Sequence, residues 1–567
     1  MAGEQWWRRA TIYALNTRTF ADGNGDGIGD LPGLIDKLDY LAALGVDTLW
    51  LTPHFPSPCA DNGYDVADYM AIAAECGTLD DYRRLLDAAH ARGLHVLLDL
   101  VLNHTSDQHP WFIESASSRD NPRADWYVWA DEPPNDWQSC FDGSAWTYHP
   151  ARGQYYYHFF LREQPDLNWR HPAVKAALWA VAHFWLDLGV DGFRLDAISA
   201  LFEDPEQRAH GLPVDLLHLR AADAQAVSEA QKAQVGEWWS RIFRHQLCQP
   251  EVHGLLRELR TLVDSYPGER ILLGEDEDIA YLGDGRDELH LVMNFPLMNV
   301  DGPLRATHVR EVMQRRLAAL PPGGVQCNLL NHIDSSRLWT HFCSGEAADG
   351  HAGLYAKLCA ALLVTLPGVP LLYYGEEIGM RDAAPADPER WRDRLALWLR
   401  RGLIDELGVE PAEATRLAAR SNRDRCRTPM QWGVGANAGF CPRGVEPWLP
   451  VAVNDAAVGV NVEVEDSGTH SLLNAYRRLL ALRRELPALY AGDWQPLDSC
   501  PGSNCLLFLR RAGEQTLFVG LNFGMTPCRP GCALSAPQLL EPLYSSGAVA
   551  HDPIALGPAG VLIARVP

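Results

Sequence analysis

Hydrophobic positions along the chain form two alternating patterns, short apolar runs and longer amphipathic stretches. The run over residues 94–102 is nearly continuous, which is typical of a parallel strand buried on both faces. Stretches over 34–44, 79–92 and 174–188 predict helices, and a glycine follows each one. The predicted strands cover residues 11–16, 48–52, 94–102, a segment that ends at Asp196, 270–275, 289–294, 326–331 and 369–374. Eight strand–helix units favour a closed (β/α)₈ barrel of the α/β class, a TIM barrel, over an open sheet.

Three insertions and a final segment depart from this alternation. Residues 105–173 are rich in Trp, Tyr, Pro, Asn and Asp without a clear helix, and they predict a loop-rich domain inserted after strand three. Further insertions cover about 203–250 and 381–425, and the second carries a charged helix over 388–406. The barrel is therefore expected over 1–104 and 174–484. Residues 485–567 predict a C-terminal antiparallel β-sandwich, with strands at 505–510, 515–522 and 560–566.

Charge and composition narrow the set of partners. The 567 residues are 47% hydrophobic and 22% charged, as in ordinary globular proteins, and the formal net charge is −24. This charge disfavours nucleic acid and anionic membranes. The apolar run over 358–374 approaches membrane length, but Pro367, Gly368 and Pro370 divide it into a helix end and a buried strand. We expect a small-molecule substrate, no nucleic-acid or membrane partner, and a monomer or small homo-oligomer.

Cysteine usage and the first residues bear on the compartment. The 13 cysteines are scattered without a CxxC pair or a zinc-ligand spacing, which favours reduced thiols. Residues 1–9 contain Trp6 and Trp7, but no apolar run follows a basic start, so no signal peptide is predicted. We therefore expect a cytoplasmic protein.

Unusual polar residues lie where four predicted barrel strands end. Strand three ends in the stretch Asp99 to His104, strand four at Arg194-Leu195-Asp196, strand five at Glu275, and strand seven at Asn331-His332-Ile333-Asp334. Active sites of such barrels lie at this end of the strands. A structural ion pair would explain Arg194 and Asp196 alone, but not polar groups at four ends. Three carboxylates with His and Arg, and without a metal-ligand set, indicate carboxylate chemistry at an acetal, as in retaining glycoside hydrolysis.

These four segments are similar to the segments that characterise the α-amylase family of glycoside hydrolases (family 13), and the resemblance extends over nearly the whole chain. Within that family, residues 164–168 (QPDLN) and 427–432 (RTPMQW) resemble the branch of oligo-1,6-glucosidases, α-glucosidases and trehalose synthases.

The resemblance implies a role for each matching residue. Asp196 would be the nucleophile, Glu275 the acid and base, and Asp334 the carboxylate that holds the ring hydroxyls. Arg194 would keep Asp196 ionised, because a nearby cation lowers a carboxylate pKa. Asp65 and Arg427 resemble the pair that binds the 4-hydroxyl of a terminal glucose. The implied substrate-binding residues are Tyr64, Asp65, His104, Arg194, His332 and Arg427.

Strand seven departs from the family pattern by one residue. The family runs Asn-His-Asp without a gap, whereas Ile333 separates His332 from Asp334 here. One extra residue in an extended backbone turns the next side chain to the opposite face. A local bulge would be needed to aim Asp334 into the site.

The loop over residues 22–30 has oxygen-bearing side chains at alternate positions. Asp22, Asn24, Asp26 and Asp30, with the Ile28 carbonyl, fit a calcium loop. It is not an EF-hand, because position 12 would be Gly33, and an acidic glycine-rich turn is the alternative. The family branch often holds calcium or magnesium at this place, so we expect one structural Ca²⁺, with Mg²⁺ as the other candidate.

The leading functional prediction is an exo-acting retaining α-glucosidase that hydrolyses short α-glucosides through a covalent glucosyl-enzyme and also transfers glucose. The alternative is a trehalose synthase, which interconverts maltose and trehalose; residues 103–112 and Ala197 resemble that group. A non-enzymatic subunit of amino-acid transporters would need a membrane helix and would lack the catalytic carboxylates, so we disfavour it. Linkage preference stays open, because Ala197 is uninformative between the Val and Thr found after the nucleophile in this branch.

Overall fold

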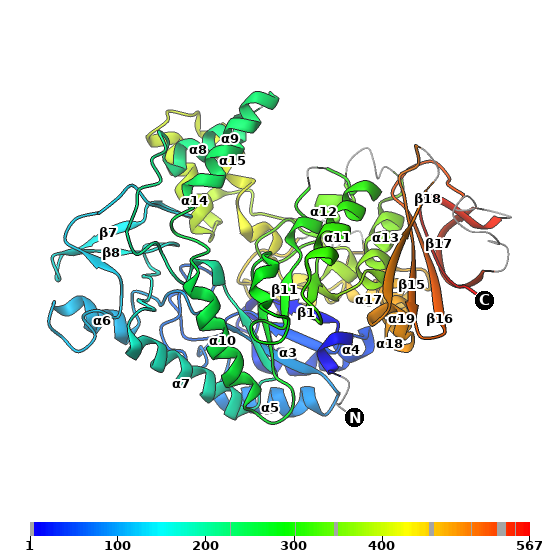
Figure 1. Cartoon of the computed structure of the whole chain (residues 1–567), viewed down its shortest axis with the longest axis horizontal. Helices are drawn as coiled ribbons and strands as arrows, with labels where there is room; N and C mark the ends of the chain where they lie inside the picture. Colours follow the sequence, from blue (N-terminus) through cyan, green and yellow to red (C-terminus); the bar gives the residue numbers. More distant parts are fainter. Residues whose placement is uncertain are drawn as a thin grey trace.

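Eight parallel strands close into a barrel at the centre of the chain (Figure 1). The computed structural model describes residues 5–226, 228–300, 302–344, 350–452, 459–499, 502–529, 540–549 and 552–567. Each barrel strand pairs with its neighbour along the chain, and the last strand pairs with the first. The predicted TIM barrel is therefore confirmed. Its strands are β1 (Ile12–Leu15), β2 (Thr48–Leu51), β3 (His95–Leu100), β9 (Gly192–Leu195), β10 (Ile271–Gly274), β11 (Leu291–Met293), β12 (Val325–Asn328) and β13 (Val369–Tyr373).

The register of β9 depends on its first residue. Gly192 has φ 146°, and a Cβ atom there would lie 2.1 Å from the Ile271 carbonyl oxygen. Only glycine allows this close approach to β10. In the resulting register Arg194 lies opposite Asp99 of β3 and Leu273 of β10.

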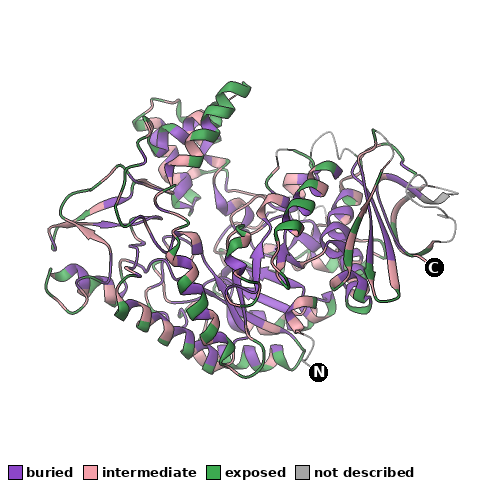
Figure 2. Ribbon diagram, viewed as in Figure 1, coloured by how far each residue is buried: buried purple, intermediate pink, exposed green. Residues whose placement is uncertain are grey.

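Helices cover the outside of the barrel, and the strands between them are almost wholly buried (Figure 2). The helix predicted at 34–44 is divided into α3 (Leu31–Asp36) and α4 (Leu38–Leu44). The apolar run over 358–374 forms the end of α13 and all of β13, both buried. Within the described residues, every helix is too short or too polar to cross a bilayer. The remaining barrel helices include α5 (Leu79–His90), α7 (Pro172–Leu188), α10 (Glu251–Asp264), α11 (Ala306–Ala319), α13 (Ala352–Thr365) and α18 (Leu472–Glu485).

The inserted domain after strand three contains more regular structure than the sequence predicted. Its helix α6 (Pro110–Ser117) was missed, although His109 caps it through a bond from the Trp111 N–H and Pro110 occupies a favourable first position. Its short strands are β4 (Trp129–Ala130), β8 (Gln154–Tyr157) and β7 (Trp146–His149) in one sheet, and β5 (Gln138–Ser139) with β6 (Gly143–Ser144) in another. Figure 1 shows this domain at the left.

Two insertions that are far apart in sequence form a single helical lobe. It consists of α8 (Leu216–Gln225) and α9 (Glu229–Ile242), from the insertion after strand four, and α14 (Arg394–Asp405) and α15 (Pro411–Ala419), from the insertion after strand eight. Leu217 of α8 packs in one apolar cluster with Leu399 and Leu403 of α14. Figure 1 shows the lobe at the top. The helix predicted at 388–406 begins later than expected, at Arg394, because Asp393 caps its first turn through the Leu395 N–H.

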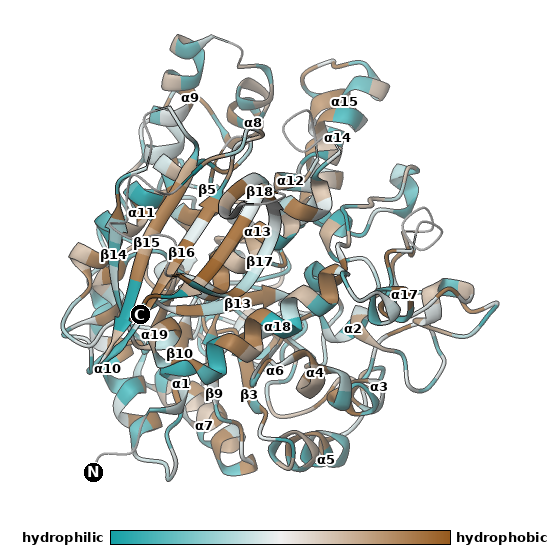
Figure 3. Cartoon of the chain, turned by 90° about the vertical axis from the view of Figure 1, so that its right-hand side faces the viewer, coloured by the Kyte–Doolittle hydropathy of each residue, from teal (hydrophilic) through white to brown (hydrophobic). Residues whose placement is uncertain are grey.

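The predicted C-terminal antiparallel β domain is confirmed, and residues 530–539 of the expected β-sandwich lie outside the described residues. Its described residues form one five-stranded antiparallel sheet, in the order β14 (Asp493–Leu497), β15 (Cys505–Ala512), β16 (Gln515–Asn522), β18 (Asp552–Arg565) and β17 (Glu541–Val549). Leu506 and Phe508 of β15 belong to the same core cluster as the barrel helices. One face of the sheet therefore packs on the barrel (Figure 3), and the other face carries a second apolar cluster that includes Leu507, Phe518 and Leu562.

Candidate active site

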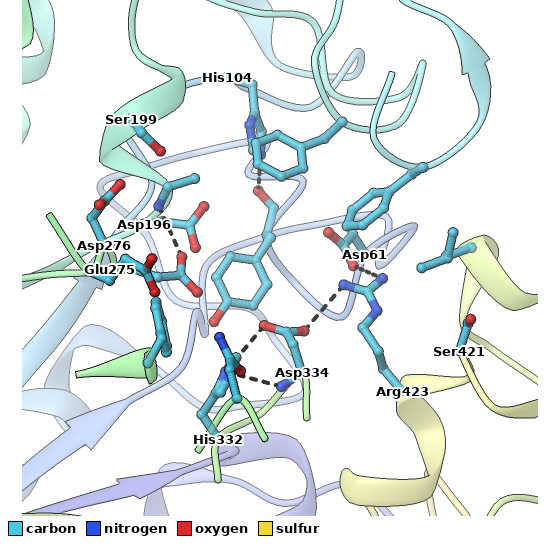
Figure 4. Close-up of a pocket in the computed structure, with 18 of the residues that line it drawn as sticks. Asp61, His104, Asp196, Ser199, Glu275, Asp276, His332, Asp334, Ser421 and Arg423 are labelled. Carbon is cyan, nitrogen blue, oxygen red and sulfur yellow. Dashed lines mark hydrogen bonds and ion pairs between the residues drawn. The ribbon is translucent and has the colours of Figure 1, made fainter. Parts of the chain in front are cut away.

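The carboxyl ends of the barrel strands open into a cavity of about 680 Å³. Of the predicted residues, Tyr64, His104, Asp196, Glu275, His332 and Asp334 line it. The inserted domain contributes Phe141 and Phe160, and the helical lobe and its flanking loop contribute Arg220, Leu395 and Arg420. Figure 4 shows Asp196 and Glu275 on one side of this cavity, with Asp61 and Arg423 on the other.

Arg194 joins three carboxylates at the bottom of the cavity. Its Nη1 donates to Asp196 Oδ1 at 2.6 Å and to Asp99 Oδ1 at 2.8 Å. Its Nη2 lies 2.7 Å from Glu275 Oε2. Both predicted catalytic carboxylates therefore bind one guanidinium, and they are neighbours although 79 positions separate them in sequence. The buried Trp50 ring lies 4.6 Å below the guanidinium and closes the site on that side.

Burial controls the protonation of these carboxylates. It raises the pKa of Asp196 to about 7 and that of Glu275 to about 8, and the charge of Arg194 only partly opposes the effect. Arg194 thus lowers the pKa of Asp196 as expected, but it does not outweigh desolvation in this structure. A retaining mechanism requires the nucleophile to be ionised while the acid is protonated, and these two carboxyls titrate together because they share Arg194.

A bell-shaped pH dependence of the rate follows, because the nucleophile must be ionised and the acid must be protonated. As pH falls through the Asp196 pKa of about 7, the nucleophile becomes protonated and the rate should drop. As pH rises through the Glu275 pKa of about 8, the acid loses its proton and the rate should drop again. The check is kcat/KM for maltose hydrolysis measured between roughly pH 5 and 10, because a departing sugar oxygen needs the proton of Glu275. A profile without an alkaline limb would contradict the assignment of Glu275.

The backbone after Asp196 holds the Glu275 carboxyl in place. Ala197 adopts a left-handed conformation (φ 42°, ψ 47°), which an L-residue with a small side chain tolerates at modest cost. Its N–H consequently points at Glu275 and donates to Oε2 at 3.0 Å. Asp196 and Glu275 are therefore coupled through a backbone turn as well as through Arg194.

The predicted sugar-binding residues form a neutral wall beside the carboxylates. The Tyr64 hydroxyl donates to Asp99 Oδ2 at 3.0 Å. Burial lowers the pKa of His104 to about 3 and that of His332 to about 4, so both rings are neutral near pH 7. Gln164, from the QPDLN segment, contacts His104 Nε2 at 2.9 Å and Asp61 at 3.3 Å. Neutral imidazoles can donate to and accept from sugar hydroxyls.

Asp334 faces the cavity despite the extra residue Ile333 before it. Burial alone would raise its pKa, but the charges of Arg427 and Arg423 hold the pKa well below the usual range. Arg423 Nη1 lies 3.3 Å from Asp334 Oδ1, and Arg427 Nη2 binds the same oxygen.

Asp334, His332 and Glu275 each offer an atom within 4.8 Å of the others. Because arginines already neutralise both carboxylates, this group suits hydroxyl binding better than a divalent cation.

The pair predicted to bind a terminal glucose requires correction. The Asp65 carboxylate accepts the N–H groups of Ala60 at 2.9 Å and Asp61 at 3.0 Å, so it stabilises a loop and does not line the cavity. Arg427 binds Asp334 rather than Asp65. The cavity contains Asp61 and Arg423 instead, joined by a 2.8 Å bond from Arg423 Nη2 to Asp61 Oδ1. The sequence could not distinguish the two pairs, because Asp61 lies four residues before Asp65 and Arg423 lies four residues before Arg427.

Comparison with known proteins agrees with this fold. Residues 13–492 match the family model described as "Alpha amylase, catalytic domain". The chain belongs to the α-amylase family. The resemblance predicted from the motifs is thereby confirmed, and this α-amylase-family chain is a glycoside hydrolase.

Curated relatives and solved structures of the α-amylase family cover nearly the whole chain. It is 36% identical over 541 residues to an oligo-1,6-glucosidase of Parageobacillus thermoglucosidasius, covering 91% of this chain and 90% of that protein. It is 37% identical over 559 residues to a probable α-glucosidase of Rhizobium meliloti (strain 1021), covering 96% and 94%. Among solved structures, the α-glucosyl transfer enzyme XgtA is 37% identical (TM-score 0.84, 100% of each chain). A mutant of the trehalulose synthase MutB, in complex with Tris, is 31% identical (TM-score 0.85, 99% of this chain and 100% of that one).

One site residue of this α-amylase-family enzyme links the cavity to the helical lobe. Asp393, the cap of α14, accepts from the Arg423 backbone N–H at 2.7 Å and from Arg423 Nη2 at 2.9 Å. The lobe thereby fixes the arginine that pairs with Asp61. Asp393 carries no local signal that would reveal this role, because it acts through a partner that is distant in sequence.

The predicted metal loop retains its oxygen donors. Asp22 accepts the N–H groups of Gly25 at 2.6 Å and Gly27 at 2.8 Å, and Asp26 accepts the Ile28 N–H at 2.8 Å. Asp30 accepts the Gly33 N–H at 2.6 Å and so caps α3. Each carboxylate keeps lone pairs beyond these bonds, and oxygen donors are the type that calcium prefers. Among the described residues, however, the three aspartates of this loop do not gather within 4.8 Å of one another, so the loop would have to close around a calcium or magnesium ion to bind it.

Proposed function

We propose that this enzyme is an exo-acting retaining α-glucosidase. It releases terminal α-linked glucose from short oligosaccharides or glucosides, and it also transfers glucose to other acceptors. One observation carries the proposal: Arg194 bridges Asp196 and Glu275 in a cavity that also contains the Asp61–Arg423 pair. Close carboxylates are the arrangement of retaining enzymes.

The first chemical step forms a bond between Asp196 and the anomeric carbon. An Asp196 oxygen attacks that carbon while the glycosidic C–O bond breaks, and Glu275 gives its proton to the departing oxygen. Arg194 stabilises the Asp196 carboxylate before attack, and the Ala197 N–H stabilises Glu275 once that residue is ionised. Asp334 would bind ring hydroxyls as the anomeric centre flattens, which its low pKa supports because it stays ionised.

The second step restores the enzyme. The Glu275 carboxylate takes a proton from water, the water oxygen bonds to the anomeric carbon, and the bond to Asp196 breaks. A sugar hydroxyl in place of water gives a transfer product by the same movement of electrons.

The Asp61–Arg423 pair supports exo action. Asp61 is 6% and Arg423 8% exposed, and both face the cavity from the side opposite Asp196 (Figure 4). A polymer chain could not pass such a buried ion pair without breaking it, whereas a terminal 4-hydroxyl can hydrogen-bond to both partners. A cavity of about 680 Å³ falls within the range that accommodates drug-sized ligands, so there is room for an aglycone as well as a glucose.

Glucosyl transfer with isomerisation is the second candidate. Relatives named α-glucosyl transfer enzyme and trehalulose synthase share the whole fold, and trehalose synthase remains the alternative drawn from the sequence. The helical lobe lines the cavity through Arg220 and Leu395, where an isomerase would need a lid that excludes water.

Product analysis by NMR separates these functions. With maltose, isomaltose or sucrose as the only substrate, we expect free glucose to accumulate, together with longer glucosides at high substrate concentration. Trehalose from maltose, or a sucrose isomer from sucrose, as the main product with little free glucose would overturn the hydrolase in favour of an isomerase. The same experiment ranks α-1,4 against α-1,6 linkages, which Ala197 leaves open.

A structural calcium ion in the 22–30 loop is a further part of the proposal. Asp22, Asn24, Asp26, the Ile28 carbonyl and Asp30 would hold it, and the ion would stabilise the loop without taking part in the chemistry. Exhaustive chelation should lower the thermal midpoint, and added Ca²⁺ should restore it by mass action. An Asp22→Ala/Asp26→Ala double variant should no longer respond. Equal midpoints for chelated and calcium-loaded wild-type protein would contradict the site.

A reducing compartment such as the cytoplasm suits this enzyme. Its cysteines are scattered along the chain without a disulfide-like or zinc-like spacing. The expected partner remains a small α-glucoside, and a monomer or small homo-oligomer remains the expected assembly.

A further inference from the structure

The extra residue Ile333 creates a bulge between the end of β12 and Asp334. Its side chain is 1% exposed and belongs to the main hydrophobic core. The Ser335 N–H donates to the His332 carbonyl at 3.1 Å, and the His332 N–H donates to Ser335 Oγ at 2.8 Å. These two bonds close a tight turn around Ile333 and Asp334, so the chain does not continue as an extended strand.

The Ile333 carbonyl is held by two donors from the loop after α15. Arg427 Nε donates to this oxygen at 3.1 Å. The Cys426 thiol lies 3.1 Å from the same oxygen and 3.1 Å from the Arg423 carbonyl, so its hydrogen is shared between two acceptors. Burial raises the pKa of the Cys426 thiol to about 12, which keeps that hydrogen in place at neutral pH.

Arg427 also reaches the carboxylate that follows the bulge. Its Nη2 binds Asp334 Oδ1, while its Nε holds the carbonyl of the preceding residue. Two contacts from one rigid guanidinium fix both the backbone and the side-chain direction of Asp334. Arg427 itself is 3% exposed and does not line the cavity, so it acts on the substrate only through Asp334.

We propose that Arg427 and Cys426 are positioning residues, which clamp the Ile333 bulge and thereby aim Asp334 at the sugar. The proposal rests on the role of Asp334 in the proposed function. It explains how a strand end that is one residue too long still delivers its carboxylate to the cavity. It also gives Arg427 a function different from the glucose-binding role predicted from the sequence.

The test compares four variants with Asp334→Asn on 4-nitrophenyl α-glucoside. Arg427→Met removes both contacts at similar side-chain length and should lower kcat by roughly 10²-fold, with a smaller change in KM, because Asp334 acts mainly in the transition state. Arg427→Lys keeps the charge but loses the planar group that makes two contacts at once. Its kcat should therefore lie between those of Arg427→Met and wild type. Cys426→Ala should lose about threefold to tenfold, whereas Cys426→Ser keeps a donor and should retain most activity.

Non-additivity distinguishes positioning from general loss of structure. If Arg427 acts through Asp334, the Arg427→Met/Asp334→Asn double variant should be no slower than Asp334→Asn alone. Arg401→Met, on the exposed face of α14, is the matched control and should leave kcat unchanged. Additive losses in the double variant, or wild-type kcat in Arg427→Met, would overturn the clamp. Wild-type activity in Asp334→Asn would instead overturn the proposed role of Asp334, so the two failures are distinguishable.

Discussion

Replacing Asp196 with alanine is expected to abolish turnover of α-glucosides. Its Oδ1 accepts a 2.6 Å bond from Arg194 Nη1 at the end of β9, and it lines the cavity beside Glu275. Without this carboxylate the covalent glucosyl-enzyme cannot form, so kcat should fall on the order of 10⁴-fold or more. The measurement is nitrophenol release from 4-nitrophenyl α-glucoside at saturating substrate.

Two controls make this result specific. Asp405→Ala, at the exposed end of α14, removes a carboxylate from a surface pair and should keep full activity. The thermal midpoint of the Asp196→Ala protein should not fall, because burial raises the pKa of Asp196 and its charged form is therefore costly to bury. Substantial turnover by a clean, folded Asp196→Ala preparation would refute its assignment as nucleophile.

Replacing Glu275 with glutamine is expected to affect substrates unequally. Burial raises the pKa of Glu275 to about 8, so the native residue is protonated at neutral pH and can serve as an acid. Glutamine cannot protonate a departing sugar oxygen, and hydrolysis of maltose or isomaltose should fall about 10²- to 10⁴-fold. Nitrophenolate is a good leaving group and needs no proton from residue 275. The variant should therefore still form the glucosyl-enzyme from the aryl glucoside.

The second step should then limit the aryl glucoside reaction, because no base remains to activate water. We expect a burst of nitrophenol and a glucosyl adduct on Asp196 that mass spectrometry detects. Equal losses on both substrates, without a burst, would show that another residue supplies the proton. Asp276→Asn is the adjacent control, since the Asp276 carboxylate accepts the Asp278 N–H at 2.8 Å and should not donate the catalytic proton.

Local patterns in the sequence were sufficient for the barrel and for the placement of Asp196 and Glu275 in one cavity. Strand and helix periodicities are properties of neighbouring residues, and eight repeats of them leave one simple closed arrangement. Asp196 and Glu275 are the last residues of predicted strands, so closure of the barrel brings them to one end. The short helix α6 escaped prediction because its eight residues offer too little periodicity.

Tertiary contacts decided the features that depend on packing between distant segments. The C-terminal strands look alike whichever layer they face, and only the tertiary structure placed one face of their sheet on the barrel. Nothing in the sequence predicts that the insertions after strands four and eight contact each other. In the structure, Leu217 and Leu399 pack together to form the lobe beside the cavity.

The carboxylate partners of Arg423 and Arg427 likewise could not be predicted from the sequence. Asp61 and Asp65, like Arg423 and Arg427, have the same residue types at a spacing of four, so spacing could not choose between them. Tertiary contacts decide between them. The Asp65 carboxylate accepts backbone N–H groups of its own loop. Arg427 binds the Ile333 carbonyl and Asp334. Residue type and strand periodicity are local properties, whereas the direction of a side chain in a loop depends on bonds to segments that are distant in sequence.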